Sequence, residues 1–427
     1  MSYRCSSRSN RSGVKMGKGK KRSALSAAVL TVALGGLGVT ASAQVPSSDF
    51  FPIGVHAQPR GSFDKWASRG VNTLFQYEGE NNSQGVPSVS MSAWSSAAAS
   101  KGLYYVRTPS ANPADDLQEQ YLLAWAQKDE PDLSNHSPNP AVNIDIYQNW
   151  KAIAPSKPVW INFAGPNVTQ AGANYTQWDK AGDWLAVDWY PINWGRYNNI
   201  NFVGASLDKL RNDSGGAPKK YMAYIETSWQ KLYAGTRGPT KDEFRGEVWS
   251  AIMHGANGII YFPQVVPTAA VGGSFSYDGT PADVAAEMTT QDSLIQSYGR
   301  VLNATRNPSS RSVSASSTAI EATWRVMQEG DYFFVLNQSP NSLTGVTLNL
   351  TGLASGLQLL NVLGEGRTEA LTGGTTIVDD FTPYQVHVYG TGGAVGAPVP
   401  EPTTLAGLGV AAGAYLLGRR ARFAYAA

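Results

Sequence analysis

The strongest constraint on the fold is a regular alternation of short apolar runs with helix-like segments between residues 51 and 265. Each run is five to eight residues long and apolar almost throughout, as is typical of strands buried on both faces of a parallel sheet. There are eight runs: 51–57, 72–77, 104–108, 122–127, 158–164, 184–191, 220–226 and 258–265. Eight such strands alternating with helices predict an α/β fold, a closed (β/α)₈ TIM barrel.

Helix-like segments separate most of these runs. They cover 63–69, 91–101, 144–153, 201–211 and 241–255. Ser90 and Thr240 stand where N-cap residues are expected, because a hydroxyl there accepts a hydrogen bond from the first turn. The segment between the third and fourth runs, 112–120, is short and predicts the least regular helix.

A second pattern follows an expected packing helix at 283–303. Short β-rich stretches separated by Gly, Asn and Ser predict a small antiparallel β-sandwich. The stretches are 318–326, 331–338, 344–351, 356–360 and 383–389. The chain is therefore expected to contain a barrel over residues 44–305 and a β-sandwich over 306–390.

Composition bears on partners and compartment. The 427 residues carry a formal net charge of +2, but the excess of basic over acidic residues lies at 4–22 and 419–422, so the middle is slightly acidic. A nucleic-acid-binding domain needs a basic face, so that class of partner is disfavoured. The charged fraction of 15% with many aromatic residues suits a secreted protein. Cys5 is the only cysteine, so no disulfide is expected.

The first 43 residues read as a secretory signal peptide. A basic stretch at 15–22 precedes an apolar stretch at 24–39, and Ala41-Ser42-Ala43 offers small residues for cleavage. A membrane anchor is the alternative, but the apolar stretch is short for a bilayer crossing.

The other end, residues 391–427, carries a linker and a second targeting pattern. Val399-Pro400-Glu401-Pro402 precedes an apolar run at 405–417 and a basic end at 419–422. This arrangement resembles the PEP-CTERM sorting tail, which an exosortase processes at the inner membrane of Gram-negative bacteria. The resemblance implies a secreted or cell-surface protein, with an ordinary C-terminal anchor as the alternative.

Two acidic motifs follow predicted strands. Lys128-Asp129-Glu130-Pro131-Asp132 follows the fourth run, and Glu226 ends the seventh. Glu130 and Glu226 lie 96 residues apart, which fits three βα units of about 31 residues each. Residues at the carboxyl ends of barrel strands share one pocket, so both carboxyls are expected there. Two carboxyls are what cleavage of a glycosidic bond requires.

The remaining predicted site residues stand at the same ends of the strands. They combine acids, amides, one arginine and aromatic rings, a mixture that binds sugar hydroxyls and ring faces. The predicted substrate-binding set is His56, Arg107, Asp129, Asn162, Asp188, Tyr190, Asn193, Trp194, Trp229 and Gln264.

Residues 51–265 resemble the clan A glycoside hydrolases, (β/α)₈ enzymes with a glutamate after strand 4 and another after strand 7. The resemblance implies that Glu130 is the general acid/base, that Glu226 is the nucleophile, and that Tyr190 bonds the nucleophile. Asn usually precedes the first glutamate in that clan, whereas Asp129 does here. A retaining mechanism needs the carboxyls about 5–5.5 Å apart, and an inverting one about 6.5–9.5 Å. Glu130 is expected to have a raised pKa.

Other interpretations stay open. Glu226 could be a buried structural carboxylate, and Asp129 to Asp132 a solvated turn. Asp188 could be a third catalytic carboxylate or a structural partner of an arginine. The chain as a whole could be a non-catalytic carbohydrate-binding barrel or a structural protein of the extracellular matrix. No cofactor is expected, because no Gly-rich phosphate loop follows a strand, and the four histidines have no metal-ligand spacing.

Overall fold

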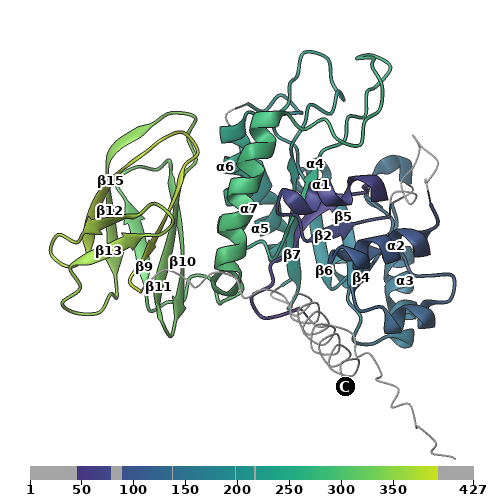
Figure 1. The fold of residues 1–427 in the computed structure, drawn as a ribbon, viewed down its shortest axis with the longest axis horizontal. Helices are drawn as coiled ribbons and strands as arrows, with labels where there is room; N and C mark the ends of the chain where they lie inside the picture. The colour runs from purple at the N-terminus through teal and green to yellow at the C-terminus, as the bar shows by residue number, and fades with distance from the viewer. Residues whose placement is uncertain (1–45, 78–88, 137, 198, 216–217, 393–427) are drawn as a thin grey trace, which may run out of the picture. The chain divides into compact units, whose positions relative to one another are not determined.

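The computed structural model describes residues 46–77, 89–136, 138–197, 199–215 and 218–392. Eight parallel strands form a closed barrel in chain order, and β8 pairs with β1 to close it (Figure 1). The strands are β1 Ile53–His56, β2 Thr73–Phe75, β3 Tyr104–Arg107, β4 Leu122–Ala126, β5 Val159–Ala164, β6 Trp184–Asp188, β7 Lys220–Glu226 and β8 Ile259–Phe262. The predicted TIM barrel is confirmed, and every strand lies within its predicted run.

Helices connect these strands and cover the barrel. The α-helices are α1 Phe63–Ser68, α2 Met91–Ser100, α3 Pro140–Ile153, α4 Gly165–Val168, α5 Asn201–Asp213, α6 Lys241–Met253 and α7 Ala282–Leu302. Short 3₁₀ helices occur at η1 Arg60–Ser62, η2 Pro113–Gln118, η3 Ser134–His136 and η4 Trp178–Ala181. The connection from β3 to β4 is thus a short 3₁₀ helix. Both predicted caps are confirmed, since Ser90 accepts from the backbone of Ala93 and Thr240 forms a capping box with Glu243.

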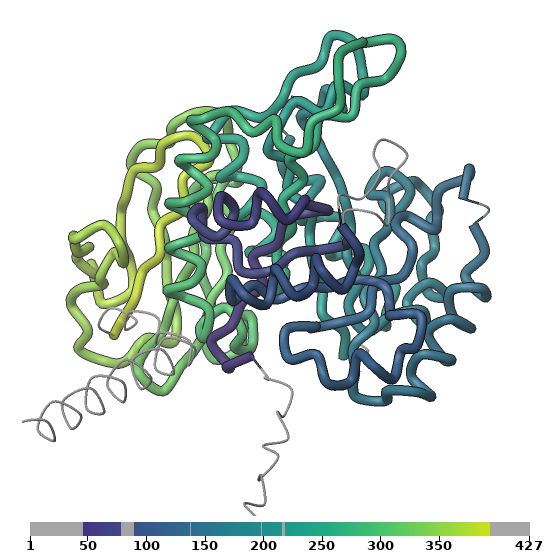
Figure 2. Tube along the Cα trace, turned by 45° about the vertical axis from the view of Figure 1, so that its right-hand side comes forward, coloured from purple at the N-terminus to yellow at the C-terminus, as the bar shows by residue number. Residues whose placement is uncertain are grey.

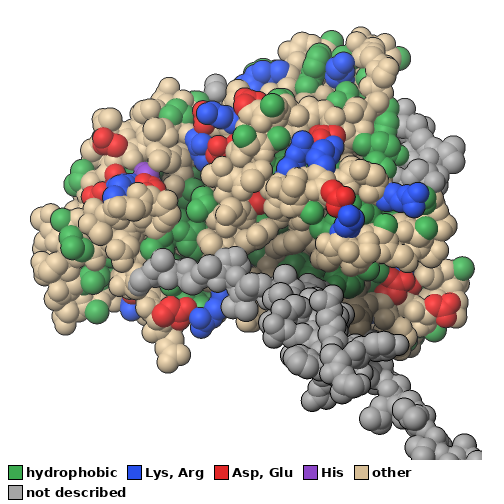
Figure 3. Space-filling model, viewed as in Figure 1, with side chains coloured by type: hydrophobic (Ala, Val, Ile, Leu, Met, Phe, Trp, Pro, Cys, Tyr) green, Lys and Arg blue, Asp and Glu red, His purple; other side chains and the backbone are tan. Residues whose placement is uncertain are grey.

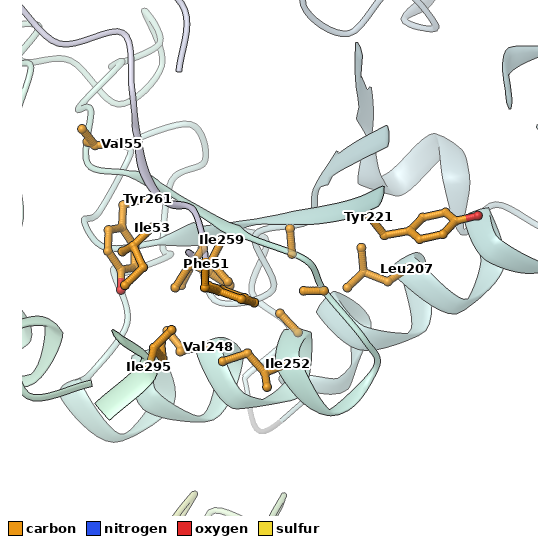
Figure 4. Close-up of a cluster of buried hydrophobic side chains, with 14 of the residues drawn as sticks. Phe51, Ile53, Val55, Leu207, Tyr221, Val248, Ile252, Ile259, Tyr261 and Ile295 are labelled. Atoms are coloured by element: carbon orange, nitrogen blue, oxygen red, sulfur yellow. The ribbon is translucent and has the colours of Figure 1, made fainter. Parts of the chain in front are cut away.

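Side chains alternate between the inside of the barrel and the layer under the helices. Tyr224 and Ile260 belong to the cluster inside the barrel. Their neighbour Ile259 faces outward instead, toward Val248 and Ile252 of α6 (Figure 4). This two-residue period fixes which side chain of each strand can reach the pocket at the barrel's end.

The C-terminal strands form two antiparallel sheets. The first has the order β10-β11-β16-β13-β14 and the second β15-β12-β9. The strands are β9 Ser312–Ala315, β10 Ile320–Met327, β11 Gly330–Asn337, β12 Leu343–Thr351, β13 Leu359–Val362, β14 Arg367–Ala370, β15 Thr376–Phe381 and β16 Val386–Gly390. Phe333, Leu348 and Ile377 belong to one buried core cluster drawn from both sheets, as in the predicted β-sandwich. The boundary at residue 305 stays a prediction.

The sequence missed three of these eight strands, β9, β14 and β15. The two domains also pack on each other, since Trp249 of α6 stacks on Phe334 of β11 with ring centroids 5.9 Å apart. On the face drawn in Figure 3, basic and acidic side chains lie interspersed.

The carboxyl ends of the barrel strands carry the longer loops. The loops that follow β7 and β8 extend past the ends of the helices in both ribbon and tube views (Figures 1 and 2). The predicted signal peptide and sorting tail lie outside the described residues. Within the described residues, no helix has both the length and the apolar character that a bilayer crossing requires.

Candidate active site

A cavity of about 330 Å³ opens at the carboxyl ends of the strands. Its lining comes from the last residues of β1, β5, β6 and β8 and from the segments that follow β1, β4, β5, β6, β7 and β8. Seven of the twelve predicted site residues line it: His56, Asp129, Glu130, Asp188, Tyr190, Trp194 and Gln264. The sequence therefore located the pocket at the correct end of the barrel.

Two carboxyl groups form the chemical centre of the cavity. The side chains of Glu130 and Asp188 are hydrogen-bonded to each other. Burial raises the pKa of Glu130 to about 8, and the charge of Asp129 adds to the shift. Burial also raises the pKa of Asp188 well above its usual range, and the neighbouring carboxyls of Glu130 and Asp129 reinforce this. The pair therefore holds a proton at neutral pH, because two carboxylates in contact cannot both ionise easily.

The backbone holds Asp188 in this position. Its carboxyl oxygen accepts a hydrogen bond of 3.3 Å from the backbone N–H of Gly165, at the start of α4. A Cβ at Gly165 would lie 2.7 Å from the carbonyl oxygen of Asp188 and 2.6 Å from the ring of Trp189. Only glycine therefore lets the two segments approach closely enough for this contact.

Other polar groups support Asp129 and the loop after β4. The side-chain amide of Asn162 donates to Asp129 over 3.0 Å, so Asn162 acts behind the cavity wall. Asp132 accepts from the backbone of Ala164 at 3.1 Å and from the hydroxyl of Tyr175 at 2.6 Å. These contacts connect the loop after β4 to the end of β5 and fix the side chains of Asp129 and Asp132.

The backbone is unusual at two residues of the cavity wall. Ala57 has a φ of 41° and Glu130 a φ of 43°, in the left-handed region that non-glycine residues rarely occupy. Such conformations cost about 1–3 kcal/mol and persist where surrounding contacts enforce them. The acid at position 130 is thus aimed into the cavity by a strained backbone.

Two further cavity residues are neutral at physiological pH. Burial lowers the pKa of His56, although the charge of Asp129 opposes the shift. Its Nδ1 atom lies 3.0 Å from the hydroxyl of Tyr224. Burial raises the pKa of Tyr190, and its hydroxyl is buried without a hydrogen-bond partner within the described parts of the chain. That hydroxyl is free to bond a ligand.

Glu226 is placed differently from the sequence prediction. It is fully buried and does not line the cavity. Its carboxylate accepts from the backbone N–H of Ile192 at 2.6 Å, and from the backbone N–H and side-chain amide of Asn193 at 2.9 and 2.5 Å. These donors draw the carboxylate toward the loop after β6. The expectation that Glu226 faces Glu130 across one opening is corrected, and its assignment as nucleophile loses its geometric basis.

A second buried acid adjoins Glu226. Glu247 of α6 is fully buried, and its carboxyl group lies close enough to Glu226 for the two acids to titrate together. Burial raises the pKa of Glu226, although Glu247 and the hydrogen bonds from Ile192 and Asn193 oppose the shift. Burial and the charge of Glu226 raise the pKa of Glu247 well above its usual range. This second carboxyl pair is enclosed within the protein, away from the cavity lining.

Arg107 is also placed outside the cavity. Val106 occupies the inside of the barrel, so Arg107 points outward under the helices. It forms a buried ion pair of 3.0 Å with Asp116 of η2 and donates to Ser95 of α2 at 2.9 Å. Although burial opposes it, the hydrogen bonds from Arg107 hold the pKa of Asp116 below its usual range. The predicted binding role of Arg107 is replaced by a structural one.

The two remaining predicted residues lie beside the cavity without lining it. Asn193 is fully buried and connects the loops after β6 and β7, since it also accepts from the backbone of Gln230 at 2.8 Å. Trp229 is half-buried and donates to Thr236 at 3.2 Å. Several lining residues were not predicted, because they come from long loops: Gln230, Leu232, Phe275 and Tyr277.

Comparisons with known proteins support the fold. No family model and no curated protein matches the sequence. Solved structures do match. A glycoside hydrolase family 5 protein from Bacteroides vulgatus has a TM-score of 0.51 at 14% identity, over 82% of this chain and 91% of that one. A putative α-galactosidase from Bacteroides fragilis has a TM-score of 0.50 at 10% identity, over 81% and 80%.

An α-amylase from Geobacillus thermoleovorans, complexed with acarbose, also has a TM-score of 0.50 at 10% identity, over 78% of this chain and 90% of that one. At such low identities the likeness concerns the fold: a (β/α)₈ barrel followed by β-strands.

Proposed function

We propose that this protein is a glycoside hydrolase in which Glu130 and Asp188 form the acting carboxyl pair. The observation that carries the proposal is the hydrogen-bonded contact of these two acids in a cavity at the carboxyl end of a barrel. Catalytic groups of barrel enzymes occur at this end. The similar solved structures, which include a glycoside hydrolase family 5 protein and an α-amylase, add support from fold likeness.

The proposed chemistry starts from the shared proton. With a pKa of about 8, Glu130 is protonated at neutral pH and can protonate the leaving glycosidic oxygen. When the shared proton resides on Glu130, Asp188 is a carboxylate and attacks the anomeric carbon, and the bond to the leaving oxygen breaks as Glu130 transfers its proton to that oxygen. Water, deprotonated by Glu130, then releases the sugar. The lining aromatic residues Trp194 and Phe262 offer faces for sugar rings.

The separation of the pair bears on stereochemistry. Retaining enzymes hold their carboxyls about 5–5.5 Å apart, whereas inverting enzymes leave about 6.5–9.5 Å for an additional water. Because Glu130 and Asp188 are in hydrogen-bond contact, they need to move less to reach the separation of retaining enzymes than that of inverting enzymes. We therefore propose retention, which proton NMR of the first-formed anomer measures directly.

The experiment that tests the function is a hydrolysis screen against polysaccharides with the wild-type protein and the Glu130→Gln variant. We expect reducing ends to appear with at least one polysaccharide, and the variant to lose this activity. The matched control is Glu329→Gln, which changes a glutamate on the surface of the β-sandwich. Activity that survives equally in Glu130→Gln would refute the assignment.

The second candidate is a carbohydrate-binding barrel without turnover. The burial of Glu226 favours it, because the glutamate expected as nucleophile is held by backbone donors. Binding of a polysaccharide by the wild-type protein without release of reducing ends would select this alternative.

We further propose that the protein is exported and acts at the surface of a Gram-negative bacterium. Support comes from the signal-like segment at 1–43 and the PEP-CTERM-like tail at 391–427. An exosortase and the inner membrane would be transient partners of that tail, and an extracellular polysaccharide the substrate. Cell fractionation of the full chain and of a chain truncated before Val399 tests this, since only the full chain should be sorted to the surface.

A further inference from the structure

The exposed aromatic side chains of the protein gather beside the cavity. Nine large apolar side chains in the described residues are more than a third exposed, and three of the nine are aromatic. These are Trp194, Tyr197 and Tyr233, with exposed fractions of 38%, 37% and 42%. All three lie in the two loops that follow β6 and β7. Clustered exposed aromatic surface marks an interaction site more often than scattered residues do.

Contacts between the two loops hold these rings in place. The ring centroids of Trp194 and Tyr233 lie 5.0 Å apart. The Arg237 guanidinium lies 4.6 Å from the ring centroid of Tyr197. The hydroxyl of Tyr197 donates to the carbonyl of Gly235 at 3.4 Å. The rings are therefore ordered before a ligand arrives, which reduces the entropy lost on binding.

The aromatic cluster is continuous with the cavity. Trp194 lines the cavity, and its ring also contacts the exposed ring of Tyr233. Gln230 lines the same cavity with 1% exposure, and within the described residues neither its amide oxygen nor its nitrogen has a partner. A cavity lined by both an unpaired buried amide and an aromatic ring is suited to a sugar, which offers hydroxyls and an apolar ring face.

The size of the cavity and the angle between the rings indicate the form of the ligand. A volume of about 330 Å³ is at the small end for ligand pockets, so a polysaccharide must extend beyond it. The planes of Trp194 and Tyr233 are inclined by 64°. A flat crystalline polymer surface needs coplanar rings, whereas a single chain can turn between successive sugars.

We propose that Trp194, Tyr197 and Tyr233 form an external binding strip for a single soluble glycan chain that continues out of the cavity. This inference rests on the proposed function and deepens it, because it assigns the binding of further sugar units to named side chains outside the cavity. Sugar units beyond the cleaved bond would stack on Tyr233 and Tyr197, outside the cavity.

The test is affinity electrophoresis in gels that contain soluble starch, galactomannan, xylan or barley β-glucan. The Glu130→Gln protein serves as parent, so that binding is measured without cleavage. Tyr233→Ala and Tyr197→Ala are added to this parent. The matched control is Val142→Ala, which shortens an exposed apolar side chain on α3. We expect each tyrosine variant to bind the retarding polysaccharide roughly three- to tenfold more weakly, and the control to bind as the parent does.

Three results would overturn the strip. The first is retardation of the parent in none of the gels, and the second is equal retardation with and without the two tyrosines. The third is tighter binding to crystalline cellulose powder than to any soluble polymer. The proposed function is judged separately, from hydrolysis by the wild-type protein. If the wild-type protein hydrolyses a polysaccharide but binding does not depend on Tyr233, the proposed function stands and the strip is rejected. If retardation depends on the tyrosines but no hydrolysis occurs, the strip stands and the proposed function is rejected.

Discussion

Replacing Glu226 separates the structural role that we assign to it from the catalytic role that the sequence suggested. In Glu226→Gln one carboxylate oxygen becomes an amide N–H₂ group. In the wild-type protein, one carboxylate oxygen of Glu226 accepts a hydrogen bond from Ile192, and the other accepts two from Asn193. In either orientation of the glutamine, a buried backbone N–H faces a donor instead of an acceptor.

The magnitude follows from the number of donors left without an acceptor. One buried unsatisfied N–H costs about 1–3 kcal/mol, so Glu226→Gln should lower the free energy of unfolding by that amount. Glu226→Ala removes both oxygens and leaves the N–H groups of Ile192 and Asn193 unpaired, for a loss of about 2–6 kcal/mol. Glu329→Gln, in a surface ion pair with Arg300, should cost about 0–1 kcal/mol.

Urea unfolding followed by circular dichroism measures these differences. The same variants also test the chemistry through azide, a small anion that can replace a missing nucleophile. Because Glu226 does not line the cavity, added azide should neither speed glycosidic cleavage by Glu226→Ala nor yield a glycosyl azide. The reasoning is refuted if Glu226→Gln unfolds like the wild type but loses hydrolysis, or if azide rescues Glu226→Ala.

Three further predictions concern individual side chains. Asp129→Asn removes a charge that raises the pKa of Glu130, so the loss of hydrolytic activity near pH 8 should move to lower pH. The control Asp145→Asn, at an exposed position, should leave the pH profile of hydrolysis unchanged. Glu247 keeps its proton in the folded protein but loses it above its ordinary pKa of 4.5 in the unfolded chain, so the free energy of unfolding falls as pH rises. Glu247→Gln should therefore flatten this pH dependence in urea unfolding measured from pH 5 to 9, and an unchanged slope would contradict the prediction. Arg107→Met leaves the buried carboxylate of Asp116 without its ion-pair partner, so the free energy of unfolding in urea should fall by about 3–5 kcal/mol with KM unaltered. A raised KM at unchanged stability would instead support the predicted binding role of Arg107.

The barrel could be predicted from the sequence because its strands are buried on both faces. The stretch 258–263 is apolar throughout, as is typical of strands buried on both faces of a parallel sheet. Two of the three missed strands of the β-sandwich lack such a buried run. Residues of β9 and β14 alternate between exposed and half-buried, and neither strand contains a fully buried side chain. Such short polar strands are set by pairing with their neighbours, which a local pattern does not reveal.

The site was predictable to the extent that strand ends define it. Position along the chain located Glu130 and Asp188, but not the direction of each side chain. For Arg107 the two-residue alternation with Val106 contains the missing signal. For Glu226 no local signal exists, since its partners Ile192 and Asn193 lie more than 30 residues away. Phe275 and Tyr277 enter the cavity from the loop after β8, whose path depends on tertiary contacts.

The central claim is that Glu130 and Asp188 act as one catalytic unit. The most direct measurement is kcat on the hydrolysed polysaccharide for Glu130→Gln, Asp188→Asn and the double variant. We expect each single variant to lose roughly 10²–10⁴-fold in kcat, and the double variant to lose little more than the worse single one, because groups that act together are not additive. Wild-type kcat in Asp188→Asn, or losses that multiply in the double variant, would contradict the account.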